Sequence, residues 1–320
     1  MEKFLCGVDL GGTKLSVGLI QPDGRIFDKN IVFYHVGKSE LQVVNLITSL
    51  IRELLTKNGL SETDLKGIGI GFPGHLRYKE GITLTSSNLK GFKNFPLRDE
   101  IAKNFQVPVL LDNDANAQAF FDFKFGAGRG YDSLIFLTIS TGIGAGIILD
   151  NKLYRGITGT AGEFGHTIVE TSGDAPLCTC GNKGCLMACA CGLSLPYHFK
   201  KKTEQGLKSS LPLPKDFDYS RVDGQLIMKG YEINDPVSTA IFNDCADYIG
   251  IGIYNIFQVF NPPIIVLGGG LMCWGEPYLS RIKSKFYLLA RDMIFDKIEI
   301  VESEAKCDAG LIGAAALLLE

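Results

Sequence analysis

The sequence predicts an α/β protein built on twisted β-sheets with helices packed against them. Apolar strand segments alternate with segments of helical spacing, which is the pattern that builds such sheets. A glycine-rich hairpin pattern also occurs twice, at residues 4 to 20 and 134 to 150. We therefore expect an internally duplicated chain.

Size and charge narrow the class of protein. A chain of 320 residues with 46% hydrophobic residues can bury a large core and is long enough for two domains. The net charge of −3, with scattered lysines and arginines, does not favour nucleic-acid binding. We expect no nucleic-acid partner.

The apolar segments do not predict targeting or a membrane span. Asp9 and two glycines interrupt the apolar start, MEKFLCGVDLGG, which is too short for a secretory signal. Polar residues and two prolines break the most apolar region, residues 248 to 271. The odd number of cysteines, nine, fits a reducing compartment. We expect a cytoplasmic protein without a membrane partner.

Each repeated hairpin has a turn suited to anions. In FLCGVDLGGTKLSVGLI the turn holds Gly11, Gly12 and Thr13, and in LIFLTISTGIGAGIILD it holds Thr141 and Gly142. Walker A and dinucleotide loops lead from a strand into a helix, so neither motif occurs here. Amides exposed at glycine turns, beside small hydroxyls, form phosphate sites. The pair predicts a polyphosphate site, although each turn alone is also explained as a tight hairpin.

The segment between the hairpins alternates helix and strand. Residues 40 to 59 show helical spacing ended by glycine, and residues 65 to 74 read as a strand and turn. VPVLLDNDANAQAF then passes from a strand through Asp112, Asn113 and Asp114 into a helix. These polar residues suit a helix N-cap, but a carboxylate at a strand's carboxyl end also lies where substrates bind in α/β sheets.

The last third of the chain adds one more glycine cluster. An apolar helix around residues 247 to 260 precedes NPPIIVLGGGL, which places Gly268, Gly269 and Gly270 at a strand end. Adenine or ribose could approach backbone there, or the cluster is a structural turn. Residues 201 to 230 are predicted to form a surface loop, and residues 308 to 320 a small-residue helix packed on a sheet.

A loop between residues 166 and 187, HTIVETSGDAPLCTCGNKGCLM, predicts a metal site. His166, Cys178, Cys180 and Cys185 supply the four nitrogen and sulfur ligands of a closed tetrahedral Zn²⁺ site. Buried or redox-active thiols are the alternative, since free cysteine often behaves as a small hydrophobe. The polar, glycine-rich TCGNKG instead suits a tight ligand loop. Cys189 and Cys191 are alternative ligands, but LMACACGLSL more readily predicts a packed helix.

Taken together, these motifs resemble the ROK family of repressors, open reading frames and kinases. GVDLGGTK and LTISTGIGAGI resemble its two phosphate loops, DNDAN its catalytic segment, EFGH with CTCGNKGC its zinc signature, and IIVLGGG its adenosine loop. The resemblance covers nearly the whole chain. It implies two actin-like ATPase (ribonuclease H-like) domains with a central cleft, residues 1–115 plus 306–320 and residues 116–305.

The resemblance implies a glucokinase-like enzyme that phosphorylates the primary hydroxyl of a hexose or N-acetylhexosamine with ATP. Asp114 would be the general base, and Asp9 would lie on the Mg²⁺ side. Zn²⁺ would be structural, with His166 serving both metal and sugar. The implied sugar contacts are Asn88, Asn113, Asp114, Glu163 and His166. The implied ATP contacts are Asp9, Gly11, Gly12, Thr13, Lys14, Thr141, Gly142, Gly268, Gly269 and Gly270, although Lys14 also reads as a solvated surface charge.

One position departs from the family pattern. Typical ROK sugar kinases have a sugar-contacting glutamate two residues after the last zinc cysteine, where this chain has Met187. Loss of one charged hydrogen bond, about 1.5 to 3 kcal/mol, weakens hexose binding roughly ten- to a hundredfold. We hypothesise that the site takes a sugar with a less polar or differently oriented group; Met187 as plain core packing is the alternative.

Two non-enzyme functions are alternatives to the kinase: a sugar-binding sensor and a transcriptional repressor. Met187 alone suggests a catalytically impaired sugar-binding sensor, which the retained Asp9, Asp114 and glycine loops oppose. Repressors of the family carry a DNA-binding domain before the first phosphate loop. That loop begins here at Gly7, so a repressor is not expected. The resemblance also implies a homodimer, for which no interface is visible in the sequence.

Overall fold

A computed structural model describes residues 2–33, 38–86, 89, 91–214, 216–294, 297–304 and 308–320. The chain divides into two compact units. Unit 1 holds Met1–Phe136, Gly146–Gly162 and Ser303–Glu320, and unit 2 holds Leu137–Ala145 and Glu163–Glu302. Residues 116–136 and 146–162 thus group with unit 1, while the predicted domain boundary at residue 115 stays a prediction.

The first sheet has the order β3-β2-β1-β4-β7. Its strands are β1 (Phe4–Leu10), β2 (Lys14–Ile20), β3 (Ile26–Phe33), β4 (Leu65–Phe72) and β7 (Val109–Asn113). β1 and β2 form the predicted antiparallel hairpin, whereas β4 and β7 run parallel to β1 and to each other. Three strands therefore end at the same edge of this sheet.

The second sheet repeats this plan. Its order is β10-β9-β8-β11-β12, with β8 (Leu134–Ile139), β9 (Ile143–Leu149), β10 (Lys152–Leu153), β11 (Ile264–Gly268) and β12 (Glu299–Glu302). Counted along the chain, the strands of both sheets are arranged third, second, first, fourth, fifth. The topology confirms the internal duplication predicted from the repeated hairpin.

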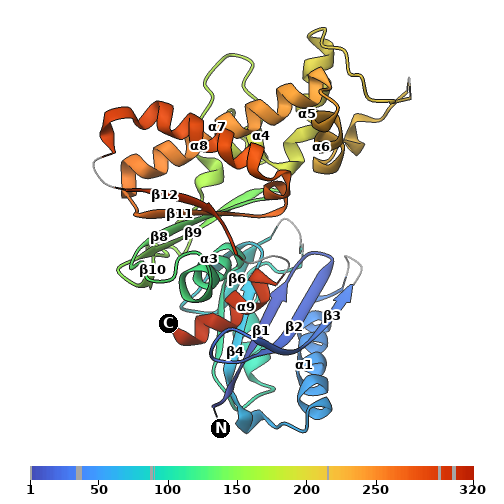
Figure 1. Ribbon diagram of the computed structural model, residues 1–320. Helices are drawn as coiled ribbons and strands as arrows, with labels where there is room; N and C mark the ends of the chain where they lie inside the picture. Colours follow the sequence, from blue (N-terminus) through green and yellow to red (C-terminus); the bar gives the residue numbers. More distant parts are fainter. Residues whose placement is uncertain are drawn as a thin grey trace. The chain divides into compact units, whose positions relative to one another are not determined.

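Helices cover both faces of the first sheet (Figure 1). Helix α1 (Glu40–Lys57), capped by Ser39 and Gln42, packs its apolar stripe on the face that carries Cys6 and Val8 of β1. Helix α9 (Ala309–Ala316) packs on the other face beside helix α3 (Asp114–Phe125). The small-residue C-terminal helix was predicted to pack on a sheet, and it does.

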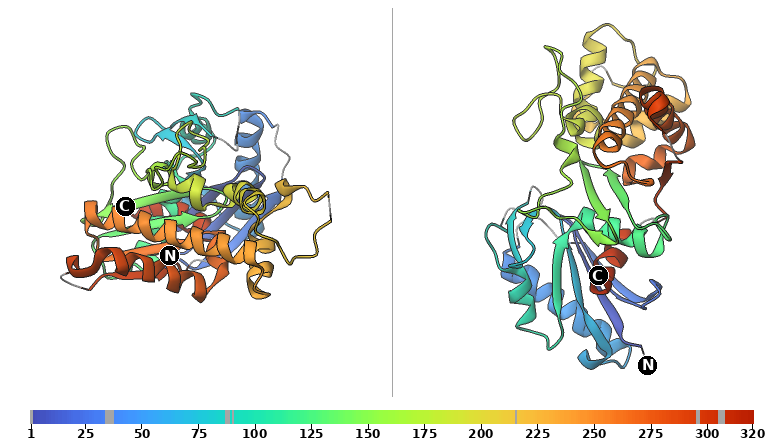
Figure 2. Two further views of the ribbon diagram at one scale, coloured as in Figure 1. Left: turned by 90° about the horizontal axis from the view of Figure 1, so that it is seen from above. Right: turned by 90° about the vertical axis from the view of Figure 1, so that its left-hand side faces the viewer.

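Unit 2 has a layer of longer helices, in which α7 (Pro236–Phe260) and α8 (Glu276–Ala290) lie side by side (Figure 2). Asp235 caps α7, Pro236 occupies its first turn, and Asn261 ends it in a left-handed conformation. The helix is longer than the predicted segment at residues 247 to 260. Its apolar stripe, centred on Ile249 and Ile253, is buried.

The prediction of a surface loop at residues 201 to 230 is wrong in part. Helix α5 (Leu195–Glu204) runs into it, and helix α6 (Gly224–Glu232) occupies its end. Asp223 caps α6 by accepting a hydrogen bond from the Leu226 amide, and Ile227 is fully buried. An N-cap and a buried apolar face outweigh the mixed composition that favoured a loop.

The remaining elements are short. They are β5 (His75–Arg77), β6 (Ile82–Thr85), α2 (Leu97–Ala102), α4 (Leu186–Ala190), and the 3₁₀ turns Glu62–Asp64, Phe164–His166, Gly192–Ser194, Tyr219–Arg221, Gly270–Trp274, Arg291–Met293 and Leu317–Leu319. Among the helices that the structure describes, none has the length and apolar character needed to cross a bilayer.

Candidate active site and metal centre

Two of the predicted site carboxylates come from one edge of the first sheet. Asp9 near the end of β1 lies opposite Gly71 of β4, and Gly71 lies opposite Asp112 of β7. Asp114 is the first residue after β7. Its Cα lies 3.7 Å from where a Cβ on Gly71 would be. This is the carboxyl edge of three parallel strands, where α/β proteins bind ligands.

The turn from β7 into α3 fixes the position of Asp114. The Oδ1 atom of Asn113 accepts hydrogen bonds from the amides of Ala115 (2.8 Å) and Asn116 (3.4 Å), so Asn113 is the N-cap. Its amide nitrogen donates to the Gly74 carbonyl at 3.1 Å. Asp114 is the first helical residue, is half-buried, and accepts from the Ala115 amide at 2.9 Å. The N-cap interpretation and a substrate-facing carboxylate are therefore compatible.

Asp9 lies in a confined setting. A Cβ on Gly310, in the first turn of α9, would be 2.8 Å from the Asp9 carboxyl carbon, so glycine is needed there. Burial raises the pKa of Asp9, Lys14 opposes this shift, and Asp308 adds to it. A divalent cation would favour the ionised form of this carboxylate, and oxygen is the ligand that Mg²⁺ prefers. Asp9 thus fits a magnesium-side role.

The first glycine turn joins β1 to β2. The Gly11 amide donates to the Lys14 carbonyl at 2.8 Å, which closes a tight turn over Gly12 and Thr13. Lys14 begins β2, and its positive charge opposes the rise in the pKa of Asp9; its contact with ATP stays a prediction. Asn88, the other predicted residue of this region, lies outside the described residues.

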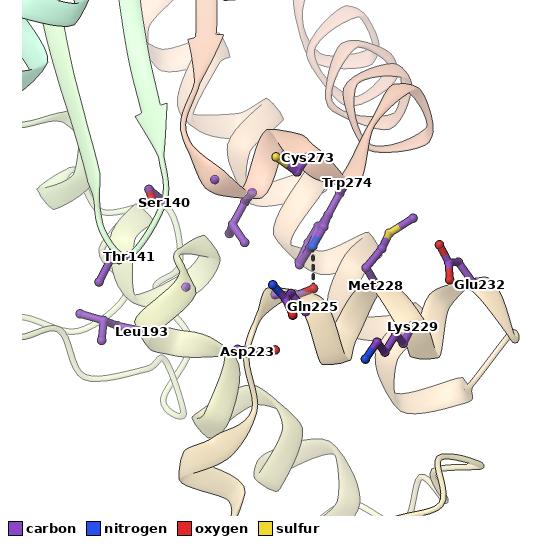
Figure 3. A pocket seen from close by; sticks show the side chains of 14 residues that line it. Ser140, Thr141, Leu193, Asp223, Gln225, Met228, Lys229, Glu232, Cys273 and Trp274 are labelled. Atoms are coloured by element: carbon purple, nitrogen blue, oxygen red, sulfur yellow. Dashed lines mark hydrogen bonds between the residues drawn. The ribbon is translucent and has the colours of Figure 1, made fainter. Parts of the chain in front are cut away.

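Unit 2 holds a cavity of about 720 Å³ where the second glycine turn and the third glycine cluster meet (Figure 3). Four segments line it. The lining residues are Ser140, Thr141, Gly192, Leu193, Asp223, Gly224, Gln225, Met228, Lys229, Glu232, Gly270, Leu271, Cys273 and Trp274. A concave, mostly apolar site with a few polar groups suits a small ligand.

Backbone hydrogen bonds hold the glycine turn at this cavity. The Ser140 amide donates to the Gly142 carbonyl at 2.8 Å, and the Gly192 amide donates to the Ser140 carbonyl at 2.7 Å. Gly269 has φ +95°, and a Cβ there would be 2.5 Å from the Ile139 carbonyl oxygen. Thr141 and Gly270 line the cavity, whereas Gly142, Gly268 and Gly269 build the backbone beside it.

The sequence reasoning missed the wall formed by α6 and the turn after β11. Gln225 and Met228 of α6, together with Cys273 and Trp274, line the cavity. The indole nitrogen of Trp274 donates to the Gly224 carbonyl at 2.9 Å and joins the two segments (Figure 3). The sequence signal was Asp223 as an N-cap before apolar residues at helical spacing.

The four predicted zinc ligands converge in unit 2. The ligand atoms of His166, Cys178, Cys180 and Cys185 all lie within 4.8 Å of one another. Cys178 Sγ is 3.5 Å from His166 Nδ1, and Cys180 Sγ is 3.7 Å from Cys185 Sγ. Tetrahedral Zn²⁺ with ordinary bond lengths separates sulfur from nitrogen by about 3.5 Å and sulfur from sulfur by about 3.8 Å. The geometry fits zinc, and Cys189 and Cys191 are buried outside this group.

The surroundings of the ligands also suit a metal. Burial raises the pKa of Cys185 to about 12, whereas the Asn182 amide lowers the pKa of Cys180. A cation at the centre would favour thiolates at both. His166 turns Nδ1 toward the thiols and Nε2 toward Glu163, whose Oε2 is 3.9 Å away. One ring nitrogen thus faces the metal ligands while the other faces a polar partner.

Residues 5–320 match the ROK family, which is nearly the whole chain. This chain belongs to the ROK family. A glucokinase from Thermotoga maritima is 33% identical over 316 residues, covering 99% of this chain and 97% of that one. A xylose repressor from Caldicellulosiruptor bescii is 30% identical, covering 98% of this chain and 78% of the repressor.

A solved ROK family glucokinase from Streptomyces griseus, in complex with glucose and AMPPNP, shares the fold. Its TM-score is 0.80 at 31% identity, and the match covers 98% of each chain. The α/β fold and the ROK assignment predicted from the motifs are both confirmed.

Met187, where the resemblance to ROK sugar kinases implies a glutamate, lies beside the predicted metal loop and the second glycine turn. It is half-buried and packs against Cys178, Cys185 and Ala188. Its sulfur is 3.4 Å from where a Cβ on Gly142 would be. Met187 therefore packs on the predicted metal loop and lies next to the second glycine turn, and its role in choosing the sugar stays a prediction beside plain core packing.

We expect the purified ROK protein to hold about one zinc per chain and Cys180→Ser to hold much less, because three ligands bind zinc more weakly than four. Cys180 is exposed, so the substitution leaves no core cavity. Metal content by mass spectrometry and thermal unfolding would measure the loss. Cys273→Ser, at an exposed cysteine outside the ligand group, is the control. Equal zinc content in Cys180→Ser and wild type would contradict the site.

Proposed function

We propose that the protein is a sugar kinase that transfers the γ-phosphoryl group of ATP to the primary hydroxyl of a hexose or N-acetylhexosamine. Support comes from the glucokinase relatives and from the Streptomyces griseus complex with glucose and AMPPNP. The observation that carries the proposal is Asp114, a carboxylate held at the first turn of α3 on the carboxyl edge of the first sheet. A positioned base at such an edge is what phosphoryl transfer requires.

In this mechanism Asp114 takes the proton of the sugar hydroxyl while that oxygen attacks the γ-phosphorus. The bond between the γ-phosphorus and the bridging oxygen breaks, and ADP leaves with the electron pair. The protein's contribution is alignment of the hydroxyl and stabilisation of phosphate charge. Asn113, Glu163 and His166 would orient the sugar through its other hydroxyls. Asn113 has a second amide N–H beyond the one that binds Gly74.

Each unit supplies proposed ATP contacts. In unit 1 the turn at Gly11–Gly12–Thr13 would donate amides to phosphate, beside Lys14, and in unit 2 the turn at Thr141–Gly142 would do the same. Adenosine would occupy the cavity of about 720 Å³, a volume in the range of small-molecule sites. Mg²⁺, held from the Asp9 side, would supply charge neutralisation of the phosphates.

Zinc would act as an organiser of the sugar side. With Nδ1 of His166 committed to the metal, Nε2 is held in one direction, toward Glu163. Fixing the ring removes conformational freedom before the sugar binds. The proposed zinc therefore affects sugar binding through His166 and takes no part in phosphoryl transfer.

A sugar-binding sensor with impaired turnover is the second candidate. Met187 in place of glutamate and the 30% identity to a xylose repressor support it. ATP consumption over a panel of hexoses and N-acetylhexosamines, paired with direct measurement of sugar binding, decides between the candidates. Sugar-dependent turnover supports the kinase, and saturable sugar binding without turnover supports the sensor.

Replacing Asp114 with asparagine should lower kcat by about 10²- to 10⁴-fold, the usual contribution of a positioned base. The side chain keeps its size, so zinc content and melting temperature should stay near wild type. A coupled ATP-consumption assay with the best sugar of the panel measures the effect. Asp216→Asn, at an exposed aspartate in the loop before α6, is the matched control. Substantial activity in Asp114→Asn would refute the assignment of the base.

Filling the cavity should weaken ATP binding and spare the sugar. Cys273 is exposed and lines the cavity, so Cys273→Trp places an indole where adenosine would lie. We expect the KM for ATP to rise about tenfold or more, whereas the KM for sugar stays within about twofold. Cys273→Ser keeps the volume and is the control. If Cys273→Trp keeps the wild-type KM for ATP, adenosine does not bind in this cavity.

The sugar preference should depend on residue 187. Met187→Glu restores the acidic acceptor of other ROK kinases, so kcat/KM for sugars with a hydroxyl at that position should rise about ten- to a hundredfold relative to the others. Met187→Leu, which keeps an apolar side chain of similar volume, should preserve the wild-type ranking. The sugar panel measures both variants. If Met187→Glu leaves the ranking unaltered, residue 187 does not select the sugar.

A further inference from the structure

A partly buried ion network lies behind the turn that carries Asp114. The Nε atom of Arg155 donates to Asp112 Oδ2 at 2.7 Å, and its two terminal nitrogens donate to the Glu320 carboxylate at 2.8 and 2.5 Å. The guanidinium also lies over the Tyr78 ring, 4.8 Å from its centroid. Planar, bidentate pairing of this kind fixes the direction of the side chain.

Asp112, which Arg155 holds in place, also binds the turn from β7 into α3 that carries Asp114. Its Oδ1 atom accepts from the Asn113 amide at 2.7 Å and from the Asn116 side-chain amide at 2.8 Å. Asn113 is the N-cap of α3, and Asn116 lies in its first turn. One carboxylate therefore ties together the residues on both sides of Asp114.

This carboxylate depends on Arg155. The Asp112 side chain is only 4% exposed and that of Arg155 12% exposed. Burial raises the pKa of Asp112, and the positive charge of Arg155 opposes that shift. Without the guanidinium, a buried carboxylate has to take up a proton or move toward water. Either change weakens its hold on Asn113 and Asn116.

We propose that Arg155 is a positioning residue for phosphoryl transfer, acting through Asp112 to hold the proposed base Asp114 in line with the sugar hydroxyl. The inference rests on the proposed kinase function. Arg155 contributes alignment and touches neither substrate. Because misplacement by about 1 Å can cost about a hundredfold in rate, a small loosening of this turn affects turnover before it affects binding.

The test measures kcat, both KM values and the melting temperature of Arg155→Met. We expect kcat to fall about 10- to 100-fold while the KM for ATP stays within about twofold, because the ATP contacts are unchanged. Arg155→Lys should have a kcat between those of Arg155→Met and wild type, since lysine restores the positive charge but not the planar, bidentate guanidinium. Arg281→Met removes a more exposed bidentate pair with Asp247 in unit 2, at 2.9 Å in both contacts, and should keep wild-type kcat.

Glu320→Gln keeps the test decisive if Arg155→Met does not fold. The Glu320 side chain is 28% exposed, so this variant should fold, and we expect kcat to fall about two- to fivefold. If Arg155→Met folds and keeps wild-type kcat, the inference is overturned. If Arg155→Met does not fold, wild-type kcat in Glu320→Gln overturns it. Either result leaves the kinase proposal intact. A wild-type protein without turnover on any sugar would overturn both.

Discussion

Close packing of helix α9 against the first sheet and helix α3 is the constraint on which unit 1 depends. A Cβ on Gly69 of β4 would lie 1.8 Å from the Ala314 carbonyl oxygen, and one on Gly313 would lie 2.0 Å from that of Ala117. Real side chains cannot enter such gaps, so backbone meets backbone there. The same helix places Gly310 against Asp9, and it supports α3, which begins with Asp114. The C-terminal helix therefore helps to set the positions of Asp9 and Asp114, the two proposed site carboxylates of unit 1.

Unit 2 relies on a different device. The predicted metal loop is mostly polar, and its four potential ligand atoms, all within 4.8 Å of one another, lie beside a small buried cluster of Cys178, Cys185 and Ala188. Met187 connects this loop to the second glycine turn by packing against Cys178 and Cys185 and lying beside Gly142. A change at residue 187 can therefore affect the proposed sugar and phosphate contacts together. This contact is the physical basis of the hypothesis that residue 187 selects the sugar.

The sequence predicted the features whose signals are local. The two glycine hairpins, α1 and the predicted metal loop each have a sequence signal that lies within about twenty residues. The signals are alternation of apolar residues, apolar residues at helical period, and the spacing of metal ligands. Helix α6 was missed because mixed charge and prolines around it hid the N-cap at Asp223. Arg155 was missed for another reason: its partners Asp112 and Glu320 are 43 and 165 residues away, so only the fold reveals the pairing. The cavity wall at Cys273 and Trp274 likewise needs three-dimensional contact.

The environments of Asp112 and Asp114 explain how two nearby carboxylates take different roles. Asp112 is nearly inaccessible, and both of its oxygens accept hydrogen bonds from named donors, one of them the Arg155 guanidinium. A buried carboxylate with three hydrogen bonds is poorly placed to receive a substrate proton. Asp114 is half-buried at the start of α3, where Asn113 rather than Asp114 supplies the N-cap oxygen. Since the capping and structural duties fall to its neighbours, Asp114 is the residue of this turn best suited to act as the base.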